Sequence, residues 1–194
     1  MAINNKSASD FAFDRAKAIR EFRVIEAINS LPIPREMQAI MYGNIRYESD
    51  NSFDINKLEV KNPGDTTAKG LGLFQKTGDT RANYLDYLNR KNVNNNELNE
   101  VLYYSDAMLG RDKIAGDYLG PGYMKDYRAF FVGRPSDIRG GKNGIPRKRY
   151  QPVFEDMHEH FVNFMMNPKR EAREASMGTR LRYSRQALEN IFTD

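Results

Sequence analysis

Apolar residues recur at steps of three and four over much of this sequence, and no other feature constrains the fold as strongly. The positions in residues 9–30 are Phe11, Ala18, Ile19, Phe22, Ile25 and Ile28. Residues 31–34, Leu-Pro-Ile-Pro, interrupt this pattern, because proline lacks a backbone donor and restrains the residue before it. The spacing resumes up to Glu48, with Pro34 suited to the first turn. We therefore expect two helices, over residues 9–30 with Ser9 as a cap and over residues 34–48.

The rest of the chain also predicts a mainly α fold. Helices are expected over residues 79–91, 97–109, 123–132, 151–166 and 169–192. Residues 70–75, Gly-Leu-Gly-Leu-Phe-Gln, read as a short buried strand or extended segment. The polar stretch before them contains Asn-Pro-Gly-Asp, a strong turn signal. A loop of this length in a compact domain is usually functional, or contains a short hairpin.

Length and composition exclude several classes of protein. The 194 residues suit one sizeable domain, or one domain with a small appendage. The absence of cysteine excludes disulfides and thiolate metal sites, and two histidines disfavour a metal centre, so we expect no metal and no cofactor. No apolar run reaches the length of a membrane span, and the N-terminal residues lack the apolar middle of a secretory signal. We expect synthesis in the cytoplasm without a cleaved signal peptide.

Positive charge gathers near the C-terminus. Residues 139–185 hold 11 Lys and Arg against 5 Asp and Glu. Residues 136–150 read as a basic connector rich in Gly and Pro, and residues 151–194 as a basic helical segment. Such a surface attracts polyanions, such as nucleic acid or acidic cell-wall polymers, although a solvated helical face is an equally good interpretation.

Glu48 is the first candidate for chemistry. It continues the helical stripe formed by Met37, Ile40, Met41 and Ile45. An acid held against apolar and aromatic surface keeps its proton near neutral pH, and such a group can protonate the departing oxygen of a glycosidic bond. The alternative is an acid that ends a helix and turns to water.

Two motifs give the sequence a family resemblance. Glu48-Ser49, followed some twenty residues later by Gly-Leu-Gly-Leu-Phe-Gln, resembles the goose-type lysozyme and lytic transglycosylase superfamily. Within it, the chain is most similar to phage tail lysozymes, virion-borne enzymes that cut peptidoglycan. The positions that match this branch further along are Thr77, Gly78, Arg81, Arg134 and Pro135. The resemblance covers about residues 35–135 and is specific where the two motifs occur together.

The resemblance implies a fold, an activity and a setting. The fold is an α+β lysozyme-like helical bundle over residues 1–135, with a small extended element that lines a glycan cleft. The activity is cleavage of the MurNAc–GlcNAc bond, which opens the bacterial wall as the phage genome enters the cell. The implied location is the virion, and the implied partners are peptidoglycan and, through the basic C-terminal part, other virion proteins. The alternatives are a non-catalytic structural or glycan-binding virion protein and a nucleic-acid-binding packaging protein.

The resemblance also assigns roles to residues. Glu48 is the catalytic acid/base, and Ser49 either assists near the substrate acetamido group or closes the helix end. Gly70 and Gly72 let backbone approach the sugar, and Gln75 points to the cleft. Phe74 packs on a sugar face in one interpretation. In the other, which we favour for Phe74 and Leu73 alike, both side chains belong to the core.

A second carboxylate separates two mechanisms. An inverting hydrolase needs a base about 6.5–9.5 Å from the acid. Asp54 and Asp65 are the candidates in the loop that also holds Asp50 and Glu59, although each suits a loop-stabilising carboxylate as well. A lytic transglycosylase needs no second acid, because a hydroxyl of the substrate attacks and an anhydro sugar forms. The sequence leaves this choice open.

The two histidines give a weaker signal. His158 and His160 are two residues apart on an expected helix, whereas a helical zinc pair requires a spacing of four. Because Glu155 and Glu159 lie beside them, we expect an ordinary solvated face.

Overall fold

The computed structural model describes residues 8–56, 70–76, 78–109, 111–112, 154–166 and 170–193. These residues form the helices α1 (Ala8–Asn29), α2 (Arg35–Glu48), α3 (Gly78–Lys91), α4 (Glu97–Met108), α7 (Phe154–Met166) and α8 (Arg170–Asn190). The mainly α class is therefore confirmed, and six of the expected helices lie within a few residues of their predicted bounds. The predicted helix over 123–132 and the connector over 136–150 lie outside the described residues. No described helix is long and apolar enough to cross a membrane.

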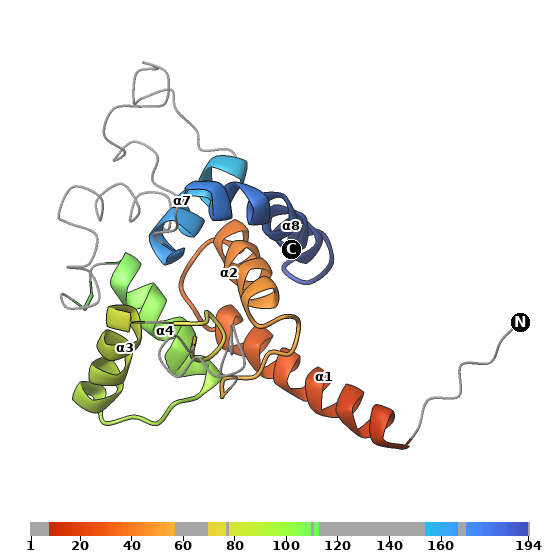
Figure 1. Cartoon of the computed structure of the whole chain (residues 1–194), viewed down its shortest axis with the longest axis horizontal. Helices are drawn as coiled ribbons and strands as arrows, with labels where there is room; N and C mark the ends of the chain where they lie inside the picture. Colours follow the sequence, from red (N-terminus) through yellow and green to blue (C-terminus); the bar gives the residue numbers. More distant parts are fainter. Residues whose placement is uncertain are drawn as a thin grey trace, which may run out of the picture.

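Helix α2 occupies the centre of the molecule. It packs against α1, α7 and α8, while α4 packs against α1 and α3 (Figure 1). Nine consecutive residues of α2, from Met37 to Ile45, are buried. A helix buried on all sides over this length positions its C-terminal end firmly, and Glu48 is the last residue of that helix.

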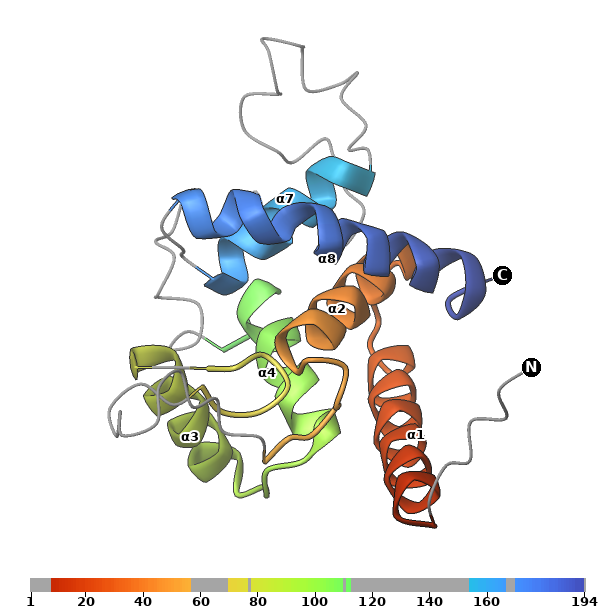
Figure 2. The same cartoon turned by 45° about the vertical axis from the view of Figure 1, so that its right-hand side comes forward.

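Helix α8 crosses over α2 (Figure 2), and the two backbones come close together at Gly43. A Cβ atom on Gly43 would lie 2.2 Å from Ser184 Oγ and 2.5 Å from the Ser184 backbone nitrogen. Glycine inside a helix costs about 0.5–1 kcal/mol relative to alanine, and here it allows the two backbones to approach. The opposing face of α8 is made of small side chains, Ser184 and Ala187, both buried.

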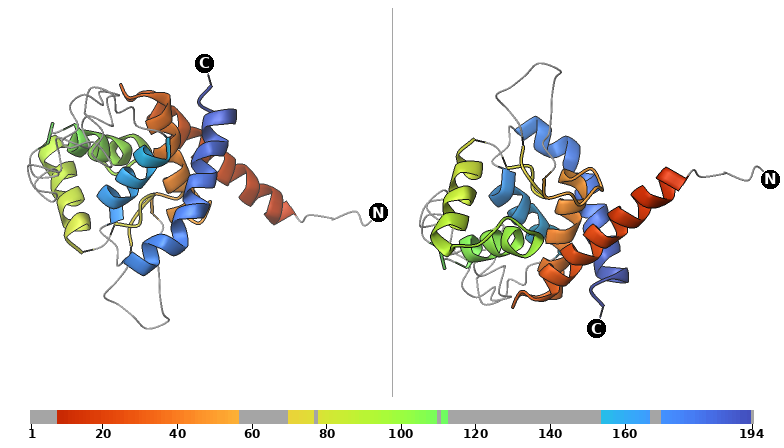
Figure 3. Two further views of the ribbon diagram at one scale, coloured as in Figure 1. Left: turned by 90° about the horizontal axis from the view of Figure 1, so that it is seen from above. Right: turned by 90° about the horizontal axis from the view of Figure 1, so that it is seen from below.

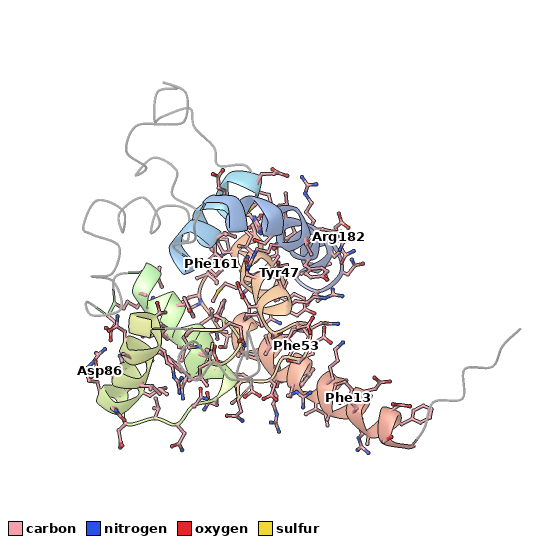
Figure 4. The ribbon with its side chains drawn as sticks, viewed as in Figure 1. Phe13, Tyr47, Phe53, Asp86, Phe161 and Arg182 are labelled. Atoms are coloured by element: carbon pink, nitrogen blue, oxygen red, sulfur yellow. The ribbon has the colours of Figure 1, made fainter. Side chains whose placement is uncertain are left out.

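Helix α1 has one buried face and one exposed face. Val24, Ala27 and Ile28 are buried. Phe11 and Phe22, which are three turns apart and share the opposite face, are 62% and 58% exposed. The N-terminal half of α1 projects from the body of the molecule, as the two views in Figure 3 and the labelled Phe13 in Figure 4 show. The spacing thus predicted the helix correctly, but part of the apolar pattern that predicted it lies on the exposed side.

The segment predicted as a strand forms a tight turn, so that prediction was wrong. Leu71 and Lys76 make a single antiparallel bridge, with both N–H···O=C distances at 2.9 Å. Gly72, at φ 79°, and Gln75, at φ 49°, reverse the chain between them. No strand occurs in the part of the chain that the structure describes. Two residues with positive φ within four positions are incompatible with an extended segment.

A buried ion pair fixes this turn to α4. Lys76 Nζ contacts Glu100 Oε1, and both side chains are fully buried. The Phe74 backbone N–H also donates to Glu100 Oε1, at 3.2 Å. Burial lowers the pKa of Lys76, and the contact with Glu100 opposes that shift. The turn is therefore held over the start of α4 by charge as well as by packing.

Candidate active site

Glu48 lies at the wall of a cavity of about 470 Å³. The side chains that line it are Arg46, Tyr47, Glu48, Asp50, Asn51, Gln75, Thr179 and Tyr183. They come from the end of α2 and the residues just after it, from the turn over residues 70–76, and from the middle of α8. The glutamate motif and the glycine-spaced motif, which are separate in sequence, thus meet at one cavity.

The carboxylate of Glu48 is held by an arginine from α8. Glu48 Oε1 accepts a hydrogen bond from Arg180 Nη2 at 2.5 Å. The side chain of Glu48 is 14% exposed, whereas that of Arg180 is 1% exposed. Glu48 therefore neither points into bulk solvent nor is cut off from the cavity.

Arg180 is fixed by contacts on every side. Its Nη1 donates to Asn44 Oδ1 and its Nε donates to Ser176 Oγ, each at 3.1 Å. The guanidinium also lies over the Tyr47 ring, 4.0 Å from the centroid. Asn44 is one helical turn before Glu48 on α2, so both present acceptors to the same guanidinium. This network orients the Glu48 carboxylate and joins α2 to α8.

The expectation of a purely apolar surrounding for Glu48 was wrong. The charged guanidinium of Arg180 contacts the carboxylate directly. Sequence reasoning treated Arg180 as one of many basic residues near the C-terminus. A signal was present, because Ser176, Arg180 and Ser184 recur every four residues and form a buried polar stripe on α8.

Ser49 closes the end of α2. It is fully buried, and its backbone N–H donates to Ile45 O at 2.9 Å. Its Oγ accepts from the Phe53 N–H at 3.2 Å. The hydroxyl is not among the groups that line the cavity. This position agrees with the helix-closing alternative rather than with a role beside the substrate.

The candidate second carboxylates differ in whether they line the cavity. Asp54 accepts the Asn56 N–H at 2.9 Å and stabilises its own turn, away from the cavity lining. Asp50, an exposed residue at φ 51°, does line the cavity. Asp65 and Glu59 lie outside the described residues. Of the loop carboxylates that the structure describes, Asp50 therefore shares the cavity with Glu48 and Asp54 does not.

The two glycines of the motif make room for side chains of this protein. A Cβ atom on Gly72 would lie 2.6 Å from Glu100 Oε2, and one on Gly70 would lie 2.7 Å from Gln75 Oε1. Gly72 also needs its positive φ for the turn. The expected reason for these glycines was close approach of a sugar, whereas the contacts assign them to building the turn.

Phe74 and Gln75 point in different directions. Phe74 is 5% exposed and packs on Tyr104, with ring centroids 4.1 Å apart, so it belongs to the core. The predicted sugar contact of Phe74 is not supported by this placement. Gln75 lines the cavity, as predicted. Its Nε2 donates to Gly72 O at 2.7 Å, and its Oε1 is buried without a donor.

His158 is buried, so the expected solvated face was wrong at this position. It is 1% exposed, and its Nε2 has no hydrogen-bond partner. Burial, and secondarily the charge of Arg180, lower its pKa from 6.5 to about 4. The imidazole is therefore neutral at pH 7, and it lies near enough to Arg180 to feel the charge of that guanidinium. The side chain of His160 lies outside the described part of the structure.

Comparisons with known proteins give no further constraint. No protein-family model matches the chain, and no curated protein or solved structure matches it. Among the described residues, no three His, Asp or Glu side chains cluster as ligands for a metal ion.

Proposed function

We propose that this protein is a lysozyme-like enzyme that cleaves the glycan strands of bacterial peptidoglycan, at the MurNAc–GlcNAc bond, with Glu48 as acid/base. One observation carries the proposal. The Glu48 carboxylate and Gln75, which belong to the two motifs that resemble the lytic transglycosylase superfamily, line the same open cavity. A carboxylate at the wall of an accessible cavity is the minimum that glycosidic cleavage requires.

The other lining groups support a carbohydrate ligand. Tyr47 and Tyr183 offer flat aromatic surface with a polar end, which suits the faces and rims of sugar rings. Asn51, Thr179 and Gln75 offer amide and hydroxyl groups that match the hydroxyl and acetamido groups of an N-acetylated sugar. A cavity with a few convergent polar groups is a normal binding site for such a ligand.

The Arg180 contact sets how Glu48 would work. The guanidinium donates to Oε1 of Glu48, so it holds the carboxylate in one orientation at the cavity wall. Arg180 would then stabilise the carboxylate again each time Glu48 gives up its proton.

The second carboxylate would decide the product. Asp50 lines the cavity and is the described candidate for holding an attacking water. If Asp50 does so, the product is a reducing sugar. If a hydroxyl of the substrate attacks instead, an anhydro sugar forms, which is lighter by one water, and Asp50 is dispensable.

The resemblance to phage tail lysozymes gives the proposal a setting. The enzyme would be carried in the virion, would act on the wall of the host, and would open it as the phage genome enters. Its basic C-terminal part would bind other virion proteins. A non-catalytic, glycan-binding virion protein is the second candidate. The Glu48–Arg180 ion pair favours it, because this pair joins α2 to α8 and so gives Glu48 a structural role that needs no catalysis.

Release of soluble fragments from dye-labelled peptidoglycan tests the proposal. We expect the wild-type protein to release dye, Glu48→Gln to release none, and Asp54→Asn to act like the wild type, since Asp54 stays out of the cavity. Circular dichroism must show all three proteins folded. Failure of the wild-type protein to release dye, or equal release by Glu48→Gln, contradicts the enzyme proposal. Binding of peptidoglycan without release supports the glycan-binding alternative.

A further inference from the structure

A stripe of exposed residues runs along α1, and the spacing of its members is symmetric. Steps of 4, 4, 3, 4 and 4 residues keep the stripe on one face of the helix. Its members are Phe11, Arg15, Ile19, Phe22, Glu26 and, just past the end of the helix, Ser30. All six are exposed, and the three large apolar side chains are 62%, 45% and 58% exposed in chain order. Because the steps are the same in both directions, this stripe matches a second copy of itself that runs the opposite way.

Antiparallel pairing about the midpoint of the stripe brings complementary groups together. The midpoint lies between Ile19 and Phe22, so each of these apolar side chains meets the other from the second copy. Arg15 then lies opposite Glu26 of the second copy, and this pair occurs twice. A parallel arrangement would instead set Arg15 against Arg15 and Glu26 against Glu26, and like charges placed opposite each other repel. Charge therefore favours the antiparallel arrangement.

The C-terminal end of the stripe coincides with a cavity. This cavity, of about 370 Å³, lies between the last turns of α1 and the start of α4. Glu26 and Ser30 line it, and Ala27 and Leu98 give it apolar wall. In the antiparallel arrangement, Phe11 of one copy lies opposite Ser30 of the other, beside this cavity. Leu98 is 42% exposed, so the ring and the wall that would receive it are both apolar surface in contact with water.

The shape of the molecule suits this pairing. The N-terminal half of α1, which carries Phe11, projects from the body (Figures 1 and 3), so antiparallel pairing sets the two bodies at opposite ends of the helix pair. At about 200 Å² for each phenylalanine, Phe11 and Phe22 together expose about 240 Å² per copy. Two copies would cover twice this area, before Ile19 and the cavity walls are counted. An area at the low end of stable interfaces, which begin near about 1,200 Å², gives a dimer that depends on concentration.

We propose that the exposed stripe of α1 is a self-association surface, on which two copies of this chain pair in antiparallel orientation and each seats its Phe11 in the cavity between α1 and α4 of the other. The Arg15–Glu26 contacts set the register of the pair. This inference is independent of the proposed glycan cleavage, because the stripe shares no residue with the cavity that Glu48 lines.

Sedimentation equilibrium of the full chain, at loading concentrations from roughly 1 to 500 μM, tests the inference. We expect the wild-type protein to form a reversible dimer within this range. Phe11→Ala should weaken dimerisation at least about tenfold, as loss of an interface anchor does. Phe13→Ala is the matched control, because Phe13 is also 62% exposed but lies two residues further on, away from the stripe. It should leave the dimerisation constant unchanged.

Charge reversal tests the register. Arg15→Glu or Glu26→Arg alone should weaken dimerisation at least about tenfold, and the double variant should restore it. The two positions are eleven residues apart, about 16 Å along one helix, so the rescue requires the second copy. Circular dichroism should show every variant folded, since all the changed side chains are exposed.

Three results would overturn the proposal. A wild-type protein that stays monomeric at the highest concentration leaves the stripe to a different partner. Equal loss of dimer in Phe11→Ala and Phe13→Ala, or no loss in either, removes the seating of Phe11 in the cavity. A double charge variant that dimerises no better than the single ones removes the antiparallel register.

Discussion

Breaking the Glu48–Arg180 ion pair should lower the free energy of unfolding, an effect that an activity assay alone would miss. Replacing Arg180 by methionine leaves a mostly buried carboxylate without its guanidinium and removes the hydrogen bonds to Asn44 and Ser176. Removal of one partner of a buried ion pair costs about 3–5 kcal/mol of unfolding free energy. Because Glu48 keeps 14% of its side-chain surface exposed, we expect about 3 kcal/mol, at the lower end of that range.

A double-mutant cycle isolates the pair itself. Glu48→Leu alone should also cost about 3 kcal/mol, because it leaves the buried Arg180 charge unpaired. The double variant Glu48→Leu with Arg180→Met should lose only about 1–3 kcal/mol, the cost of leaving the buried Asn44 Oδ1 without its donor, since apolar residues replace the ion pair itself nearly without cost. Arg182→Met, at an exposed position on the same helix, is the control and should change stability by less than about 0.5 kcal/mol.

Urea denaturation followed by circular dichroism measures all four free energies. A loss below about 1 kcal/mol for Arg180→Met would show that the pair contributes little, as exposed ion pairs do. Additive losses in the double variant would show that the two side chains are not coupled in the folded protein. Either result would refute the claim that α8 holds Glu48 in place.

Two further predictions concern the crossing of α2 and α8, and the buried histidine of α7. Gly43→Ala should destabilise the fold by about 2 kcal/mol in thermal or urea unfolding, because its Cβ meets Ser184. Gly178→Ala is the control: a Cβ there meets nothing within 4 Å, so this variant should be more stable by up to about 1 kcal/mol. Equal effects of the two substitutions would contradict the close crossing. The low pKa of His158, about 4, means that the unfolded chain binds a proton there below pH 6.5 while the folded protein does not. The unfolding free energy should therefore fall by up to about 3 kcal/mol between pH 6.5 and pH 4. His158→Phe should lack this part of the fall. If urea titrations give the variant the same pH dependence as the wild type, His158 is not its source.

Helical periodicity predicted the elements of this fold well. Its signal is local, because the side chains three and four residues apart that define it lie on one helix. It predicted Glu48 at the end of a buried helix for the same reason. Periodicity does not show which apolar residues find a partner, so it did not separate the buried Ile28 from the exposed Phe22 on α1.

The site was predictable only in part. Glu48 and Gln75 were found from motifs, and they do share a cavity. Arg180 was missed because its contact with Glu48 joins positions 132 residues apart, which no local pattern records. The short strand was predicted from the apolar content of residues 70–75. Backbone dihedral angles determine the conformation of this segment instead, since Gly72 and Gln75 both have positive φ and turn the chain.

The mass spectrum of a defined muramic acid-containing oligomer after incubation tests the central claim most directly. Wild-type protein should convert the oligomer to shorter fragments cut at MurNAc, each with either a reducing end or an anhydro end. Glu48→Gln, verified as folded, should leave the oligomer intact. An oligomer that survives the wild-type protein, or the same fragments from both proteins, would contradict a catalytic role for Glu48.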